Sequence, residues 1–150
     1  MGLKQQIDGD IKKAMLAKNK EELEALRAIK SLILLAETDK GSTGDISAET
    51  ENKLLQKAVK QRKESAEIFQ QQGRQELADR ENFQLDIISR YLPKQLTEDE
   101  IINSLKNIIQ QVGAKGPQDM GKVMGTATKT LSGQADGKMI SDLVKKLLNA

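Results

Sequence analysis

The stretch YLPKQLTEDEIINSLKNIIQQV, residues 91–112, decides how the chain is organised. Pro93 disfavours helical geometry in the residue before it, so a preceding helix is expected to end there. Thr97 and Glu100 match a capping box, which marks the start of another helix. The apolar residues that follow recur at helical spacing; they are Ile101, Ile102, Leu105, Ile108, Ile109 and Val112. This stretch therefore predicts a domain boundary at Pro93.

The part before the boundary, residues 1–93, has the pattern of about four long helices. Asn19 and Ser47 are suited to cap the second and third helices, because their side chains can accept from free backbone N–H groups. Gly41 to Ile46 is expected to be a loop that follows the second helix, and Gly73 is expected to break the third from the fourth.

Two patterns on these helices bear on burial and charge. The apolar run Leu32 to Leu35 widens the apolar stripe of the second helix, which predicts that this helix is the most buried. The third helix carries lysines at spacings of four, three and three: Lys53, Lys57, Lys60 and Lys63. Such a row is typical of a solvated face, although a binding surface stays open as an alternative.

The part after the boundary, residues 94–150, has the pattern of three shorter helices. Gly113 is suited to end the first of them, Pro117 to begin the next, and Asp136 to cap the last. We find no apolar alternation typical of strands. The sequence therefore predicts an all-α protein, with an N-terminal bundle of about four long helices followed by a small three-helix C-terminal domain.

The composition argues against most catalytic and metal sites. The chain contains no His and no Cys, which removes the usual proton carrier, thiol nucleophile and zinc ligands. The acidic clusters Glu21-Glu22 and Glu98-Asp99-Glu100 lie at expected helix starts, where negative charge is stabilising. We therefore expect no catalytic residues, no metal and no cofactor. The N-terminus lacks an apolar leader segment and no apolar run could span a bilayer, which predicts a cytoplasmic protein without a membrane partner.

Positive charge is concentrated near the C-terminus. Residues 1–93 contain 16 basic and 16 acidic side chains, whereas the 50 residues from Ile101 contain seven lysines and three acids. A local excess of lysine is favourable for contact with nucleic-acid phosphates. Residues 94–150 contain no Arg and no aromatic side chain, so base stacking and bidentate base reading are not expected there.

Two glycines, Gly121 and Gly125, lie four residues apart in an expected helix, with Lys122 beside them. Each glycine costs a helix about 1 kcal/mol relative to alanine, so the pair calls for a reason. The sequence leaves two explanations open. Another backbone of the protein packs closely against them, or a nucleic-acid backbone approaches them.

At these residues the chain resembles the GatB/YqeY family. The resemblance rests on a series of short motifs along nearly the whole chain: Leu3-Lys4, Leu26-Arg27, Tyr91-Leu92-Pro93, Gly121 to Gly125, Gly133-Gln134-Ala135-Asp136-Gly137-Lys138 and Leu143 to Leu148. It implies a stand-alone bacterial protein with two all-α domains. The second domain would be similar to the C-terminal tail of the B subunit of tRNA-dependent amidotransferase, a carbon–nitrogen ligase that uses glutamine as amide donor.

The resemblance implies that the C-terminal domain contacts tRNA. The residues that the resemblance implies for that surface are Gly121, Lys122, Gly125, Gly133 and Lys138. We predict that Lys129 belongs to the same surface. Gln134 departs from the family pattern, in which lysine is common, and so removes one positive charge. Because the catalytic part of the B subunit and the Ser–Lys signature of the amidase subunit are both missing, the ligase activity itself does not transfer to this chain.

Three functions are therefore weighed. A non-catalytic tRNA-binding accessory module ranks first. A protein-interaction or scaffold domain with no nucleic-acid role, meeting its partner through the N-terminal helices, ranks second. An amidotransferase component ranks third, because the sequence has no recognisable ATP site or ammonia source.

Overall fold

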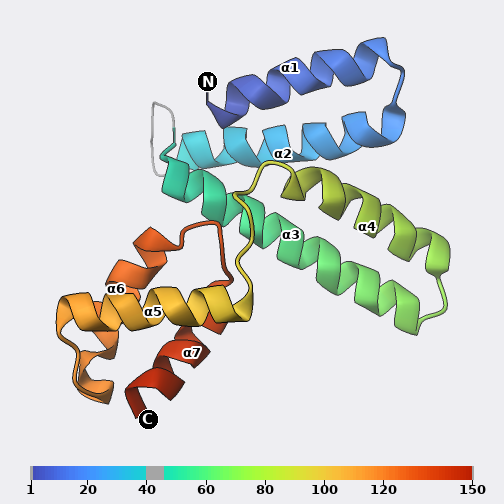
Figure 1. Ribbon diagram of the computed structural model, residues 1–150. Coiled ribbons are helices and arrows are strands. Elements are labelled where there is room, and N and C mark those ends of the chain that lie inside the picture. Colours follow the sequence, from blue (N-terminus) through green and yellow to red (C-terminus); the bar gives the residue numbers. More distant parts are fainter. Residues whose placement is uncertain (1, 40–45, 150) are drawn as a thin grey trace. The chain divides into compact units, whose positions relative to one another are not determined.

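The computed structural model describes residues 2–39 and 46–149, and these residues form helices without a strand, so the all-α prediction is confirmed. Contacts along the described chain divide it into two compact units, with the division between Leu92 and Pro93. The helices of the N-terminal unit (Figure 1) are α1 (Leu3–Leu16), α2 (Lys20–Thr38), α3 (Ala48–Gln71) and α4 (Gln75–Ser89). Those of the C-terminal unit are α5 (Glu98–Val112), the 3-10 helix η2 (Pro117–Asp119), α6 (Met120–Thr130) and α7 (Gly137–Asn149).

Local signals in the sequence set the helix ends of the N-terminal unit. The side chains of Asn19 and Ser47 accept from the backbone N–H groups of Glu22 and Thr50, at 3.2 and 3.1 Å, as predicted for helix caps. Gly73 adopts a φ of +72° between α3 and α4, a conformation that glycine reaches without steric cost. Of the loop predicted from Gly41 to Ile46, all but Ile46 lies outside the described residues, and Ile46 lies before α3.

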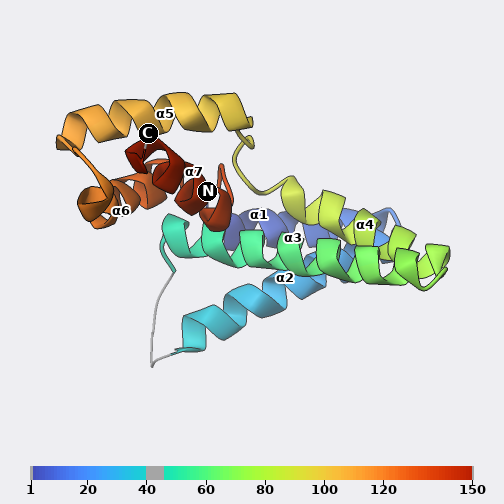
Figure 2. The same ribbon diagram turned by 90° about the horizontal axis from the view of Figure 1, so that it is seen from below.

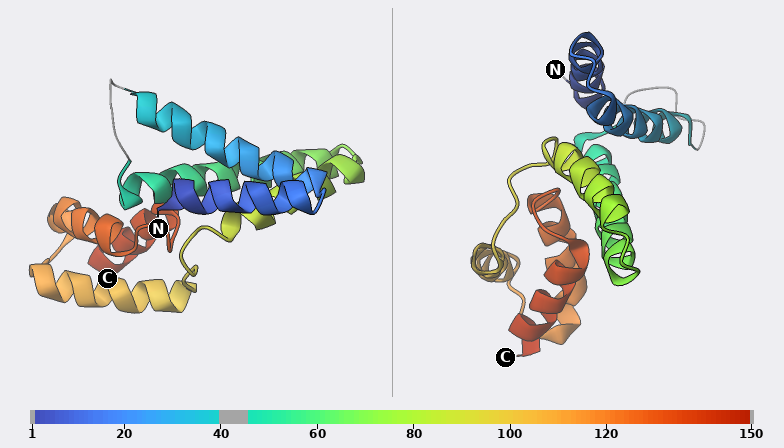
Figure 3. Two further views of the ribbon diagram at one scale, coloured as in Figure 1. Left: turned by 90° about the horizontal axis from the view of Figure 1, so that it is seen from above. Right: turned by 90° about the vertical axis from the view of Figure 1, so that its right-hand side faces the viewer.

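The N-terminal unit consists of two helix pairs, α1 with α2 and α3 with α4, which α2 connects by contacting α3 and α4. Figures 2 and 3 show α2 and α3 diverging toward the C-terminal end of α2. The most buried large side chains of this unit are all aliphatic: Ile7, Leu26, Ile29, Ile33, Leu55, Ile87 and Ile88. The apolar run Leu32 to Leu35, which was expected to widen the buried stripe of this helix, is buried only in part. Leu34 and Leu35 are 42% and 68% exposed, because the described helices that pack against α2 leave these two side chains largely uncovered.

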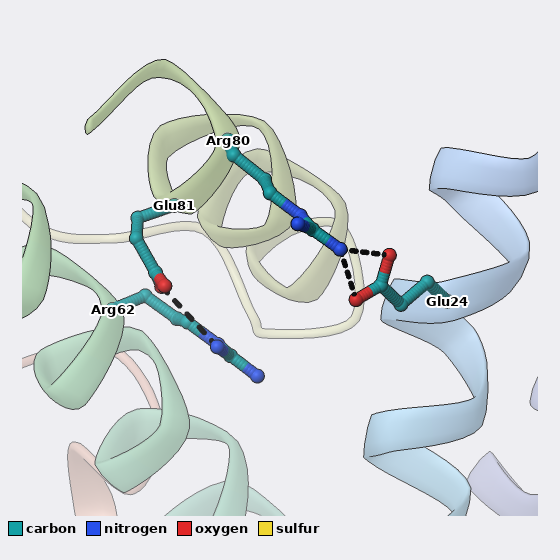
Figure 4. Close-up of polar contacts among 4 residues, drawn as sticks. All are labelled: Glu24, Arg62, Arg80 and Glu81. Atoms are coloured by element: carbon teal, nitrogen blue, oxygen red, sulfur yellow. Dashed lines mark hydrogen bonds and ion pairs between the residues drawn. The ribbon is translucent and has the colours of Figure 1, made fainter. Parts of the chain in front are cut away.

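Charged side chains join the helices of the N-terminal unit (Figure 4). Arg80 of α4 contacts both carboxylate oxygens of Glu24 in α2 at 2.7 Å, and Arg62 of α3 contacts Glu81 of α4 at 3.2 Å. The hydrogen bond and the negative charge of Glu24 raise the pKa of Arg80, so the guanidinium stays charged. These pairs link α2, α3 and α4 around the rim of their apolar core.

The C-terminal unit is organised around the capping box predicted at Thr97. The Thr97 hydroxyl accepts from the N–H of Glu100, and the Glu100 carboxylate accepts from the N–H of Thr97, at 3.2 and 3.1 Å. These two bonds, first that to the backbone of Thr97, lower the pKa of Glu100. At the other end of α5, Gly113 ends the helix with a φ of +68°.

The C-terminal unit encloses an apolar core of its own, to which α5, α6 and α7 all contribute. Its most buried large side chains are Ile101, Leu105, Val123 and Val144. The segment before α5 is fastened to the α6–α7 turn, because the N–H of Leu96 donates to the carbonyl of Gln134 at 2.9 Å. In the described part of the chain, no helix is long and apolar enough to cross a membrane.

Candidate nucleic-acid interface

The exposed face of α6 carries four of the predicted site residues: Gly121, Lys122, Gly125 and Lys129, all exposed. Seven residues are about two helical turns, so Lys122 and Lys129 lie on one face roughly 10 Å apart along the axis, with Gly125 between them. The opposite face is buried through Val123 and Ala127. The buried face of α6 therefore directs the glycines and lysines away from the core of their own unit.

Neither glycine of α6 packs closely against another backbone. A Cβ atom built at Gly121 or at Gly125 meets no atom within 4 Å outside its own stretch of helix. The sequence left open that another backbone of the protein packs closely against these glycines. Among the described residues, no such backbone lies beside them. The cost of two helical glycines, about 1 kcal/mol each, remains without a packing reason.

The lysines of the C-terminal unit form no ion pair with another described residue, since the ion pairs that the described residues form all lie before Pro93. The acidic residue that directly precedes α6 is engaged elsewhere. The carboxylate of Asp119 accepts from the backbone N–H of Lys115 at 2.9 Å. Lys122 and Lys129 are therefore available to a negatively charged ligand.

Helix α7 supplies a second row of positive charge. Lys138 is exposed in its first turn, and Lys145, seven residues later, is exposed on the same side of the helix. Lys145 was not among the residues predicted from the sequence, although its seven-residue spacing from Lys138 is the signal that identifies it. Asp136 precedes α7, and its backbone carbonyl accepts from the N–H of Ile140 at 3.0 Å. The carboxylate of Asp136 is exposed and opposes anion binding at this helix start.

Gly133 differs from the other predicted site residues, because it is buried. Its φ of +76° explains the choice of glycine in the turn between α6 and α7. Its carbonyl accepts from the side-chain amide of Gln95 at 2.6 Å. Gly133 therefore shapes the turn and fastens it to the segment before α5, and the exposed face described above does not include it.

The described residues contain no group of three acidic side chains that could hold a metal ion. The exposed face of α6 instead combines lysines with helical glycines that no neighbouring group covers. Such a surface can neutralise phosphates and allow a backbone to come close.

Comparison with known proteins gives relatives over most of the chain. A protein of Pyrenophora tritici-repentis named "Altered inheritance of mitochondria protein 41, mitochondrial" is 31% identical over 148 residues, which cover 96% of this chain and 80% of the relative. A protein of the same name from Clavispora lusitaniae is 37% identical over 107 residues, covering 70% of this chain and 61% of the relative. The chain thus spans about three to four fifths of these relatives.

A shorter match connects the chain with amidotransferases. A glutamyl-tRNA(Gln) amidotransferase subunit of Thermococcus gammatolerans is 40% identical over 55 residues, which are 34% of this chain and 9% of that subunit. This match supports a distant homology with the C-terminal region of amidotransferase subunits. It covers too little of the archaeal protein to carry over that enzyme's activity.

The relatives correct one prediction. Their names place them in mitochondria, so the prediction of a cytoplasmic protein is wrong. That prediction depended on the lack of an apolar leader segment and of a membrane-spanning run, and neither feature separates the cytoplasm from mitochondria.

A family-wide comparison covers nearly all of the sequence. The profile of the family described as "Yqey-like protein" matches residues 4–148, which include both units. The resemblance inferred from short motifs is therefore confirmed, and the chain belongs to the Yqey-like protein family.

Proposed function

We propose that this chain is a non-catalytic accessory protein that binds tRNA through the exposed face of α6, together with the lysines of α7. The observation that carries the proposal is the pair of unobstructed glycines, Gly121 and Gly125, beside Lys122 and Lys129, which form no ion pair with any residue that the structure describes. A protein that keeps two costly glycines on an exposed helix face has a reason to keep side chains away from that face.

The chemistry of the face favours the sugar–phosphate backbone over the bases. Lysine neutralises phosphate as a point charge, whereas base reading depends mainly on Arg, Asn, Gln or aromatic side chains. Because α6 contains no Arg, Asn, Gln or aromatic residue, its exposed face would recognise the shape of folded RNA. The match to a glutamyl-tRNA(Gln) amidotransferase supports tRNA as the RNA class.

The test is a filter-binding titration of the full chain against tRNA at about 50 mM and about 200 mM salt. With roughly four phosphate contacts, we expect the affinity to fall about a hundredfold between the two. The variant Lys122→Glu/Lys129→Glu should bind at least about tenfold more weakly at the lower salt concentration and show a shallower salt slope.

A matched control is Lys57→Glu/Lys60→Glu, which makes the same charge change on the exposed face of α3. The proposal predicts near-normal tRNA binding for this variant. No binding by the unmodified chain at low salt, or an equal loss in the two variants, would contradict the proposal.

A second candidate function is a protein-interaction domain, because α2 and α3 enclose an apolar groove. The groove has a volume of about 390 Å³, and its lining includes three leucines and two lysines: Leu32, Leu35, Leu54, Lys53 and Lys57. A partner bound there would be recovered with the full chain in stoichiometric amount and without RNA. The variant Leu35→Glu should then lose the partner, and RNA-dependent recovery would favour the first function.

A further inference from the structure

The turn between α1 and α2 exposes two large apolar side chains. Met15 is 54% exposed and Leu16 is 86% exposed, the largest fraction among the exposed large apolar residues of the described chain. In Figure 1 this turn lies at one end of the antiparallel pair formed by α1 and α2. Transfer of such side chains out of water is favourable, so an apolar surface that receives them would gain binding energy.

Lysines surround this apolar tip. Lys12 and Lys13 lie one helical turn before Leu16, at the i−4 and i−3 positions that share its side of the helix. Lys18 and Lys20 follow within and just after the turn, and all four lysines are exposed. Residues 11–20 therefore combine four positive charges with no acidic side chain.

The acidic residues nearest along the chain are mostly engaged within the N-terminal unit. Asp10 accepts a hydrogen bond from the hydroxyl of Tyr91. Glu22 accepts from the side-chain amide of Asn19 at 3.0 Å and is paired with Arg90 at 3.4 Å. Glu21 is exposed and offsets part of the charge, which leaves the tip positive overall.

The backbone holds the tip in a defined shape. Lys18 adopts a φ of +56°, the one non-glycine residue with positive φ among the described residues. The N–H groups of Lys18 and Asn19 donate to the carbonyls of Met15 and Ala14 at 3.2 and 3.0 Å, which closes the end of α1. A fixed tip binds without the entropy cost of ordering a loop.

We propose that the α1–α2 turn docks onto an anionic lipid surface, with Met15 and Leu16 entering the interfacial region and the four lysines contacting lipid phosphates. Peripheral membrane binding combines burial of apolar side chains with attraction of basic side chains to anionic lipids, and this turn offers both. An RNA backbone would attract the lysines equally but would gain nothing from Leu16. This proposal departs from the expectation of no membrane partner, which considered only an apolar leader segment and membrane-spanning runs.

The test is sedimentation of the full chain with phosphatidylcholine vesicles that contain either no anionic lipid or about 30% phosphatidylserine. We expect binding to the anionic vesicles alone, weakened by salt. The variant Leu16→Asp should lower the partition coefficient at least about tenfold. The matched control Leu35→Asp changes another exposed leucine of the same unit and should bind as the unmodified chain does.

A second pair of variants tests the charge. Lys12→Glu/Lys13→Glu should also lower vesicle binding at least about tenfold, whereas Lys57→Glu/Lys60→Glu should not. Both changed pairs are exposed, so circular dichroism should report unchanged helix content. Equal binding to neutral vesicles, equal effects of Leu16→Asp and Leu35→Asp, or loss of tRNA binding without loss of vesicle binding in the Lys12/Lys13 variant would overturn the proposal.

The outcome is independent of the proposed tRNA function. The variant Lys122→Glu/Lys129→Glu, designed against tRNA binding, should retain full binding to anionic vesicles, because both substitutions lie in the C-terminal unit. Loss of vesicle binding in that variant would also overturn the assignment to the α1–α2 turn.

Discussion

The two units of this chain use charge in opposite ways. In the N-terminal unit, Arg80 and Arg62 reach carboxylates on neighbouring helices and help to join them. In the C-terminal unit, the described lysines reach no carboxylate, and α5, α6 and α7 are joined through an apolar core. Charged residues of the N-terminal unit therefore contribute to its stability, whereas the lysines of α6 and α7 are free to serve binding. This difference between the units can be tested with substitutions that are expected to change stability in one unit and binding in the other.

The largest stability effect is expected in the core of the C-terminal unit. Leu105 is fully buried between its helices, and Leu105→Ala should lower the free energy of unfolding by about 3 kcal/mol, because it leaves a cavity. Urea unfolding followed by circular dichroism measures this loss. Leu34→Ala, at an exposed position of α2, is the control, and an equal effect of the two substitutions would contradict an apolar origin of the unit's stability.

The next largest effect on stability is expected where Tyr91, near the end of the N-terminal unit, donates a hydrogen bond to Asp10 of α1. Tyr91→Phe removes the hydroxyl that donates to Asp10 and should lower the free energy of unfolding by about 1.5 kcal/mol. Burial, followed by the hydrogen bond to Asp10, raises the pKa of Tyr91 above its ordinary value of 10.0.

This raised pKa gives the Tyr91 prediction a pH signature. A raised folded-state pKa means that the stabilisation is fully present below the unfolded-state pKa of about 10 and is lost as the pH rises through the folded-state value. The stability difference between the unmodified chain and Tyr91→Phe should be constant from neutral pH to about pH 9 and shrink above about pH 10. A difference that grows at alkaline pH would show that the hydroxyl stabilises the unit by another route.

A smaller effect compares one charge reversal in each unit. Arg80→Glu sets a carboxylate against Glu24 and should lower the free energy of unfolding slightly, with a smaller loss in high salt because the pair is exposed. Lys122→Glu places an acid in the first turn of α6 and should leave stability unchanged or raise it by about 0.5 kcal/mol. Thermal unfolding of both variants distinguishes these signs, and a loss in Lys122→Glu would mean that this lysine is structural.

The sequence predicts helix ends well, because they depend on local chemistry. Asn19, Ser47 and Thr97 cap helices as expected, and Gly73 and Gly113 adopt left-handed conformations where helices end. These residues act within three or four positions of themselves, so their effect can be read without knowledge of tertiary contacts.

Burial is less predictable, because it depends on how many helices surround each one. Leu34 and Leu35 extend an apolar run but remain 42% and 68% exposed, since the described helices that pack against α2 leave them largely uncovered. Likewise, nothing in the order of residues separates Gly133, which shapes a buried turn, from Gly125, which lies on an open helix face. Only the fold separates the glycines needed for structure from those available for binding.

The glycine face of α6 gives the most direct test of the account. Gly125→Leu adds a side chain where a Cβ meets no atom within 4 Å, so it should raise helix stability by up to about 1 kcal/mol. We predict that the same variant binds tRNA at least about tenfold more weakly at about 50 mM salt, because the added side chain keeps the phosphate backbone away. Gly9→Leu, at an equally open position of α1, should gain stability without losing tRNA affinity. Unchanged tRNA affinity in Gly125→Leu would contradict the assignment of this face.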